Sequence, residues 1–290
     1  MSPSHPPMSR CYAGATVVLG TMHGKQAAIA PALYETAGLF VTVTPEFDTD
    51  RFGTFARDIA RGGTMEDAAL AKANAAIDAS GLDLGLASEG SYGPHPAIPM
   101  IPSGHEMLVF VDRTRNLTVT EQLLTADVTF AHTVVRDRDM LAPFLKRVGF
   151  PEQRLVVRPA DRPDAVDGMT KGVAGDEELA VAFATARGLS STGEVLIETD
   201  MRAFGNPQRL RTIGILSRRL GERLGRHCPR CDAPGFGSDR AIPGLPCAEC
   251  GAPTAMPLAI ERRCLICEES MRLPTSHTTA DPGHCPSCNP

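Results

Sequence analysis

The chain has 290 residues, of which 42% are hydrophobic and 22% charged, and its formal net charge is −5. This composition is that of a globular protein with room for one large core and an accessory module. The negative charge argues against a generally basic nucleic-acid binder. No stretch approaches about 18 apolar residues, and the opening MSPSHPPMSR lacks the apolar part of a signal peptide. We therefore expect a cytoplasmic protein without a membrane partner, with residues 1–10 disordered.

Short β-branched runs alternate with helical patterns from residue 11 to about 225, as is typical of an α/β sheet. Strands are predicted at Ala15–Gly20, Leu39–Thr44, Asp83–Ser88, Met107–Asp112, Leu117–Glu121, Val128–His132, Leu155–Arg158 and Val195–Thr199. Helices are predicted at Ala30–Ala37, Met65–Ala79, Asp137–Val148 and Glu177–Arg187. Residues 159–175 are expected to form a surface loop. The prediction is an α/β domain over residues 11–226, a mixed open sheet with helices on both faces.

Polar side chains follow four of the predicted strands, in TMHGK, PEFDTDRFGTF, ASEGSYGPHP and IETDMRAFGNP. The candidate site residues in these segments are His23, Lys25, Asp48, Asp50, Glu89, His95, Asp200 and Arg202. A lysine beside a glycine at a strand–helix junction can bind phosphate, and paired aspartates can share a divalent cation. Each segment alone also has a plain structural explanation, such as an aspartate that caps its own turn. Because ligands of open α/β sheets lie at the carboxyl ends of strands, the four segments together predict one active or binding site.

A basic helix is predicted before the C-terminal tail. Residues 202–226 contain seven arginines and a single acid, Glu222. Asn206 is a good cap, Pro207 suits the first turn, and Gly225 can end the helix. The apolar residues fall near one face, which places five arginines on the flanks and the far side, at positions 209, 211, 218, 219 and 223. Two interpretations remain open: a solvated face on a core-packed helix, or a surface that meets phosphate or an acidic partner.

The tail contains four Cys-x-x-Cys pairs, and two such pairs can complete a tetrahedral zinc site. The eight cysteines are Cys228, Cys231, Cys247, Cys250, Cys264, Cys267, Cys285 and Cys288. A redox dithiol normally occurs once, beside a βαβ pattern, and disulfides need an oxidising compartment. We therefore predict two structural zinc sites. Sequential pairing needs the shortest loops, so residues 227–290 are expected to form two consecutive zinc ribbons. A closed all-cysteine site leaves no position for catalysis at zinc.

The motifs TMHGK, DTDRFGTF, ASEGSYGPHP and TDMRAFGNP, with the Cys-x-x-Cys tail, resemble an uncharacterised bacterial family known as a domain of unknown function. The resemblance covers nearly the whole chain from about residue 11. It implies that the N-terminal domain and the tail belong together, and it supplies no activity.

Residues 15 to about 120 also resemble, more loosely, the inosine triphosphate pyrophosphatase superfamily. The segments that carry this resemblance are TMEDAALAKA after Gly63, the strand end TMHGK, and the acidic segment SEGS. The resemblance implies attack of water on a nucleotide phosphate with the help of Mg²⁺ or Mn²⁺. Lys25 would hold the phosphate, while Glu89 and an aspartate such as Asp112 would hold the metal. His23 stands where that superfamily has asparagine.

Two hypotheses follow. The leading one is a metal-dependent hydrolase or transferase that acts on a phosphorylated, nucleotide-like substrate and carries two structural Zn²⁺ ions. The alternative is a non-enzymatic adaptor that uses residues 202–290, the basic helix and the ribbons, to bind a protein or nucleic acid.

Overall fold

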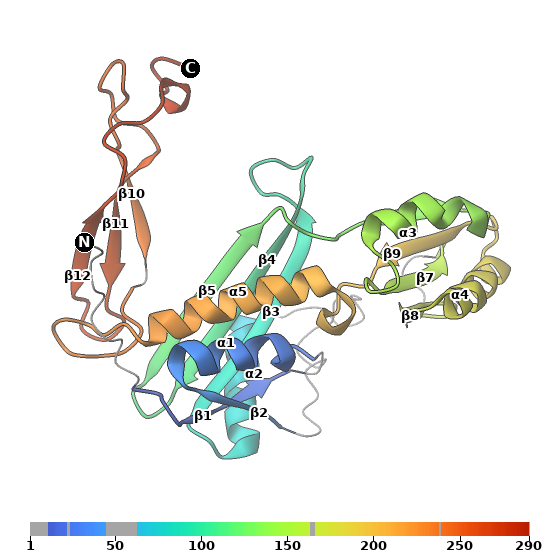
Figure 1. Ribbon diagram of the computed structural model, residues 1–290, viewed down its shortest axis with the longest axis horizontal. Helices are drawn as coiled ribbons and strands as arrows, with labels where there is room; N and C mark the ends of the chain where they lie inside the picture. The colour runs from blue at the N-terminus through green and yellow to red at the C-terminus, as the bar shows by residue number, and fades with distance from the viewer. Residues whose placement is uncertain (1–10, 22–23, 45–62, 163–165, 238, 290) are drawn as a thin grey trace.

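The computed structural model describes residues 11–21, 24–44, 63–162, 166–237 and 239–289, and their strands form three sheets. Figure 1 shows the largest sheet in the middle, a smaller α/β unit on one side, and on the other a narrow strand module that carries the C-terminus. The predicted α/β class is confirmed. However, the strands expected in one sheet between residues 11 and 226 divide between two sheets.

The central sheet has the strand order β2-β1-β3-β4-β5. Its strands are β1 (Thr16–Gly20), β2 (Phe40–Val43), β3 (Leu84–Pro94), β4 (Pro102–Asp112) and β5 (Leu117–Thr125). β1 is parallel to β2 and β3, and β4 and β5 extend the sheet with antiparallel pairing.

Helices cover both faces of the central sheet because apolar side chains alternate along its strands. Leu19 and Leu86 belong to the core beneath α1 (Gln26–Ala37) and α5 (Pro207–Leu224). Val18 and Ala87 face the opposite way, toward α2 (Met65–Ser80). Neighbouring residues of one strand point to opposite faces of the sheet, so the place of a residue in this alternation decides which helix it contacts.

Side-chain caps set where two of these helices begin. The Thr64 hydroxyl accepts a hydrogen bond from the Asp67 N–H at 3.1 Å, and the Asp67 carboxylate accepts one from the Thr64 N–H at 2.9 Å. The Asn206 side chain accepts from the Arg209 N–H at 2.9 Å, and Pro207 follows it in the first turn of α5. These bonds satisfy N–H groups that a helix start leaves without partners.

The smaller α/β unit lies between β5 and α5 in the chain and has the strand order β6-β9-β7-β8, antiparallel throughout. Its elements are β6 (His132–Val135), α3 (Ala142–Val148), β7 (Leu155–Pro159), β8 (Thr170–Val173), α4 (Asp176–Leu189) and β9 (Val195–Thr199). The side chains of α3 and α4 form one apolar core with alternate residues of these strands. We call this unit the insert.

The structure corrects two predicted loops. The segment ASEGSYGPHP is strand as far as Pro94, because β3 stays paired with β4 up to the match of Pro94 with Pro102. Residues 159–175, expected as a loop, contain β8. In both places, pairing with a neighbouring strand overrides the low strand propensity of glycine and proline.

The basic helix is confirmed as α5, but two of its arginines do not lie on the outside. Arg209 and Arg223 are 1% and 5% exposed, and each pairs with a glutamate of the sheet, Glu106 or Glu121. The arginines that remain exposed on this helix are Arg211, Arg218 and Arg219. Burial is tolerated because each buried guanidinium meets a carboxylate and main-chain carbonyls.

The tail forms a three-stranded antiparallel sheet of β10 (Arg240–Pro243), β11 (Pro257–Arg263) and β12 (Ser270–Pro274). It stands at the C-terminal end of α5 (Figure 1). Within the described residues, none of the helices combines the length and the apolar character needed to cross a membrane.

Candidate functional site

The eight cysteines of the tail gather into two groups of four. One group contains Cys228, Cys231, Cys264 and Cys267, and the other Cys247, Cys250, Cys285 and Cys288. Within each group all sulfurs lie within 4.8 Å of one another, and the closest contacts between pairs are 3.6 to 3.8 Å. A tetrahedral zinc ion with Zn–S bonds of about 2.3 Å requires sulfurs about 3.8 Å apart, whereas a disulfide brings them to about 2.0 Å. The donor set therefore fits two structural Zn²⁺ ions.

The prediction of sequential pairing is wrong, because the clusters join the first pair to the third and the second to the fourth. The tail sheet gives the reason. β10 carries the chain away from the first pair, β11 brings it back, and β12 carries it away again. Alternate pairs therefore meet at the same end of the sheet. The ribbons are interleaved and not consecutive.

The order of the central sheet creates a topological switch point between β1 and β3. The chain leaves β1 through α1 toward β2 on one side, and returns through α2 to β3 on the other. α1 and α2 lie on opposite faces of the sheet. Neighbouring parallel strands whose connections run in opposite directions form a topological switch point, where open α/β sheets bind ligands.

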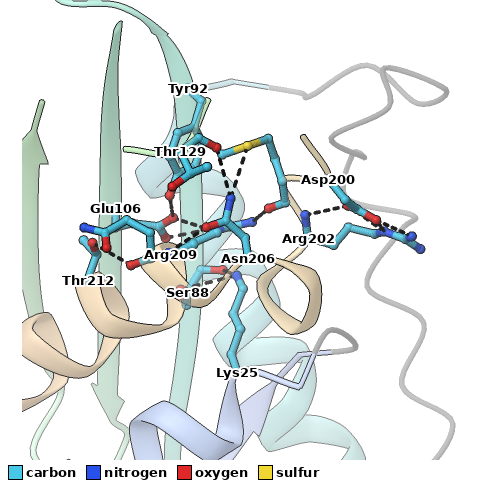
Figure 2. A network of polar contacts seen from close by, with 12 residues as sticks. Lys25, Ser88, Tyr92, Glu106, Thr129, Asp200, Arg202, Asn206, Arg209 and Thr212 are labelled. Atoms are coloured by element: carbon cyan, nitrogen blue, oxygen red, sulfur yellow. Dashed lines mark hydrogen bonds and ion pairs between the residues drawn. The ribbon is translucent and has the colours of Figure 1, made fainter. Parts of the chain in front are cut away.

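Lys25 lies at this switch point, five residues after the end of β1. Its side chain is buried at 5% exposure, and its Nζ donates to the carbonyl of Ser88 at 2.7 Å and contacts the Ser88 hydroxyl at 3.3 Å. The pairing of β1 with β3 stops at Gly20 and Ala87, so Ser88 is the first residue of β3 beyond it. Figure 2 shows the lysine reaching up to this strand.

The amine of Lys25 has a pKa far below that of an ordinary lysine. Burial, together with the positive charge of Arg209 and, less strongly, of Lys72, lowers its pKa to about 7, although the carboxylates of Glu106 and Glu89 act in the opposite direction. A neutral amine can accept a proton, and an anion placed beside it would restore the charged form.

Two buried ion pairs flank β3 next to Lys25. Glu89 pairs with Lys72 of α2 on one face of the sheet. Glu106 pairs with Arg209 of α5 on the other face, with Nε 2.6 Å from Oε1 and both side chains fully buried. The second pair has an additional hydrogen-bond partner, because the Tyr92 hydroxyl donates a hydrogen bond to Glu106 at 2.6 Å (Figure 2).

Close packing holds this network in place. A Cβ on Gly90 would lie 2.5 Å from Oε1 of Glu106 and 2.6 Å from Nη2 of Arg209. Only glycine leaves room for the ion pair against β3.

Burial and the neighbouring Glu106 carboxylate both raise the pKa of Tyr92, so its hydroxyl remains a donor.

The predicted site residues do not all meet. Lys25 and Glu89 lie in the cluster just described, which we call the switch-point cluster: Lys25, Lys72, Ser88, Glu89, Tyr92, Glu106 and Arg209. Asp200 and Arg202 form an ion pair to one side of it, with Nη2 2.6 Å from Oδ2 (Figure 2). His23, Asp48 and Asp50 lie outside the described residues.

Two further predicted residues have structural roles away from the cluster. His95 lies beyond the end of β3, where its Nδ1 accepts from the N–H groups of Ala97 and Ile98 at 3.2 Å. Asp112 ends β4 opposite Leu84, six residues from Glu106 along the strand. Burial would raise the pKa of Asp112, but hydrogen bonds from Thr114, Arg115 and Tyr12 hold it below its usual value.

The sequence interpretation missed Lys72, Glu106 and Arg209 as site residues. Each left a local signal, since a charged residue stands where the pattern of its element requires an apolar one. Lys72 falls on the buried stripe of α2, and Glu106 shares the face of β4 that carries Leu108 and Phe110. The sequence around each of these residues does not predict which opposite charge it pairs with.

The switch-point cluster favours an anion. Among the described residues it contains three basic groups and two carboxylates, and each carboxylate already pairs with a cation. Outside the cysteine clusters, the described residues contain no group of three or more side chains placed to hold a metal ion, so the expected Mg²⁺ or Mn²⁺ finds no support there.

The family described as "Domain of unknown function (DUF6671)" matches residues 72–290. The match begins within α2 and includes the insert, α5 and the whole tail, whereas the expected resemblance began near residue 11. No curated protein is similar enough to this chain to count as a relative. Neither finding supports the expected resemblance of residues 15–120 to the inosine triphosphate pyrophosphatase superfamily.

Proposed function

The chain belongs to the family of the domain of unknown function DUF6671, whose description assigns no activity, so we propose a function from the site alone. The protein binds a phosphorylated small molecule at the switch-point cluster and acts on it as a hydrolase or transferase. The observation that carries the proposal is the buried amine of Lys25 between the carboxyl ends of β1 and β3. A phosphate beside this amine would restore its proton and gain a charge-assisted hydrogen bond.

The neighbouring ion pairs suit such a ligand in different ways. Arg209 is held by Glu106 and by the carbonyl of Met201, so its position needs no rearrangement when the ligand binds, and its charge helps to lower the pKa of Lys25. Glu89 is held by Lys72 on the other face. A carboxylate in this position is a candidate base that could activate water or a hydroxyl group for attack on phosphorus.

The zinc clusters act as a scaffold in this proposal. Each cluster has four sulfur ligands, which leaves no open position on the metal for chemistry. Thiolates must stay reduced to bind zinc, and this requirement favours the cytoplasm as the location. The adaptor alternative loses part of its basis, because Arg209 and Arg223 of the basic helix are buried in ion pairs.

Binding and turnover by the zinc-loaded protein test the proposal. Nucleoside phosphates, sugar phosphates and inorganic phosphate would be screened by thermal shift, with and without Mg²⁺. A ligand present at about 100 times its Kd stabilises the protein by about 2.7 kcal/mol, which is readily measured. We expect Lys25→Met to abolish this shift and any turnover.

Lys146→Met serves as the matched control, because Lys146 is exposed on α3 and belongs to no site. The proposal fails if no phosphorylated compound shifts the melting temperature or is turned over. It fails equally if Lys25→Met and Lys146→Met bind the ligand as the wild type does.

A further inference from the structure

A second guanidinium, that of Arg154 on the insert, lies against the turn between β9 and α5. Arg154 immediately precedes β7, and its guanidinium carbon lies 5.1 Å from the centre of the Phe204 ring. Arg202 contacts the same ring at 4.7 Å. Two cations thus share one aromatic side chain in the short turn between β9 and α5.

The two arginines differ in what satisfies them. Arg202 is engaged by Asp200, with Nε 3.1 Å from both carboxylate oxygens and Nη2 2.6 Å from Oδ2. The guanidinium of Arg154 has neither a hydrogen-bond nor an ion-pair partner among the residues that the structure describes. Its charge is therefore available to a ligand, while that of Arg202 is already compensated.

The position of Arg154 is nevertheless fixed. Its N–H donates to the carbonyl of Gly205 at 2.8 Å, and its carbonyl accepts from the N–H of Asp200 at 2.7 Å. Its aliphatic stem lies along Gly205, where a Cβ would meet it at 3.1 to 3.4 Å. An arginine held at its backbone, its stem and its aromatic contact loses little freedom when it binds an anion.

Phe204 connects this arginine to the Lys25 segment. A Cβ on Gly24 would lie 3.4 Å from the Cβ of Phe204, so the two backbones approach closely. Gly24 directly precedes Lys25. The turn that carries Phe204 therefore lies against both Arg154 and the segment that carries Lys25.

We propose that Arg154 forms a second anion-binding subsite, so that the ligand carries two separate anionic groups, one at Lys25 and one at Arg154. This inference rests on the proposed function and narrows its substrate class. The second group is a phosphate or a carboxylate, because both accept two parallel hydrogen bonds from a guanidinium.

Matched ligands that differ by one anionic group test the subsite. Two such pairs are fructose 6-phosphate with fructose 1,6-bisphosphate, and adenosine 5′-monophosphate with adenosine 3′,5′-bisphosphate. Calorimetry on the zinc-loaded protein would give the Kd of each compound. We expect the wild type to bind at least one bisphosphate about tenfold more tightly than its monophosphate, and Arg154→Met to remove this preference.

Arg147→Met is the matched control, because Arg147 stacks on Phe144 of the same insert at 5.3 Å and lies on the exposed side of α3. It should keep the wild-type preference. The second subsite is refuted if the wild type binds both members of each pair equally, or if the preference survives in Arg154→Met. Those outcomes leave binding at Lys25 intact. Failure of both monophosphates and bisphosphates to bind the wild type would refute the subsite and the proposed function together.

Discussion

Replacing Arg209 with methionine would break the most deeply buried ion pair that joins α5 to the central sheet. The side chains of Arg209 and Glu106 are both fully buried, and their closest atoms are 2.6 Å apart. Methionine keeps the apolar stem but removes the charge. Glu106 would then remain in the core with Tyr92 as its remaining donor among the contacts described above.

The expected loss follows from this burial. Removing one partner of a buried pair typically costs about 3 to 5 kcal/mol, because the other charge stays desolvated without compensation. For domains of this size each kcal/mol lowers the melting temperature by roughly 2 to 4 °C, so we expect a fall of about 10 °C. Thermal and urea unfolding followed by far-UV circular dichroism would measure it.

The same helix supplies the control. Arg218 pairs with Glu35 at 2.6 Å, but the two side chains are 51% and 57% exposed. An exposed pair contributes about 0 to 1 kcal/mol, so Arg218→Met should unfold almost as the wild type does. Equal and small losses in Arg209→Met and Arg218→Met would refute the buried ion pair.

Two further predictions concern the tail and the packing of β3. Cys231→Ser with Cys264→Ser should leave one zinc per chain by atomic absorption, because both residues belong to one cluster, whereas Cys231→Ser with Cys250→Ser should leave none. Sequential pairing predicts the reverse. Gly90→Ala should destabilise the protein by about 1 to 3 kcal/mol, because the new methyl group would overlap the buried ion pair. Gly93→Ala, on the same strand, meets nothing within 4 Å and should have a much smaller effect; equal melting temperatures would contradict this packing.

Local signals in the sequence predicted most elements of residues 11–226, although the strand expected at Val128–His132 is β6 at His132–Val135. The cap at Thr64 and the cap at Asn206 place the starts of α2 and α5 correctly, because a capping side chain acts within its own first turn. The eight zinc ligands are equally local, since each pair forms one tight turn. Such features depend on residues a few positions apart.

Long-range pairing explains what the sequence did not reveal. Alternation of buried residues shows that β7 and β9 have an inner face, but not that they belong to a second sheet. Arg209 and Glu106 lie 103 residues apart, so the sequence around either residue does not predict its partner. The pairing of the cysteines is likewise set by the strands that carry the chain between the ends of the tail sheet.

The protonation of Lys25 during binding tests the central claim most directly. With a pKa of about 7, the free amine is about one-tenth protonated at pH 8, while a phosphate monoester is already a dianion there because its second pKa is about 6. Calorimetry of the tightest-binding phosphate monoester in buffers of different ionisation enthalpy should show uptake of close to one proton at pH 8. Uptake should fall to about half a proton at pH 7, and Lys25→Met, which is expected to lose binding, should show no uptake. Binding without proton uptake at pH 8, or with the same uptake in Lys25→Met, would contradict the account.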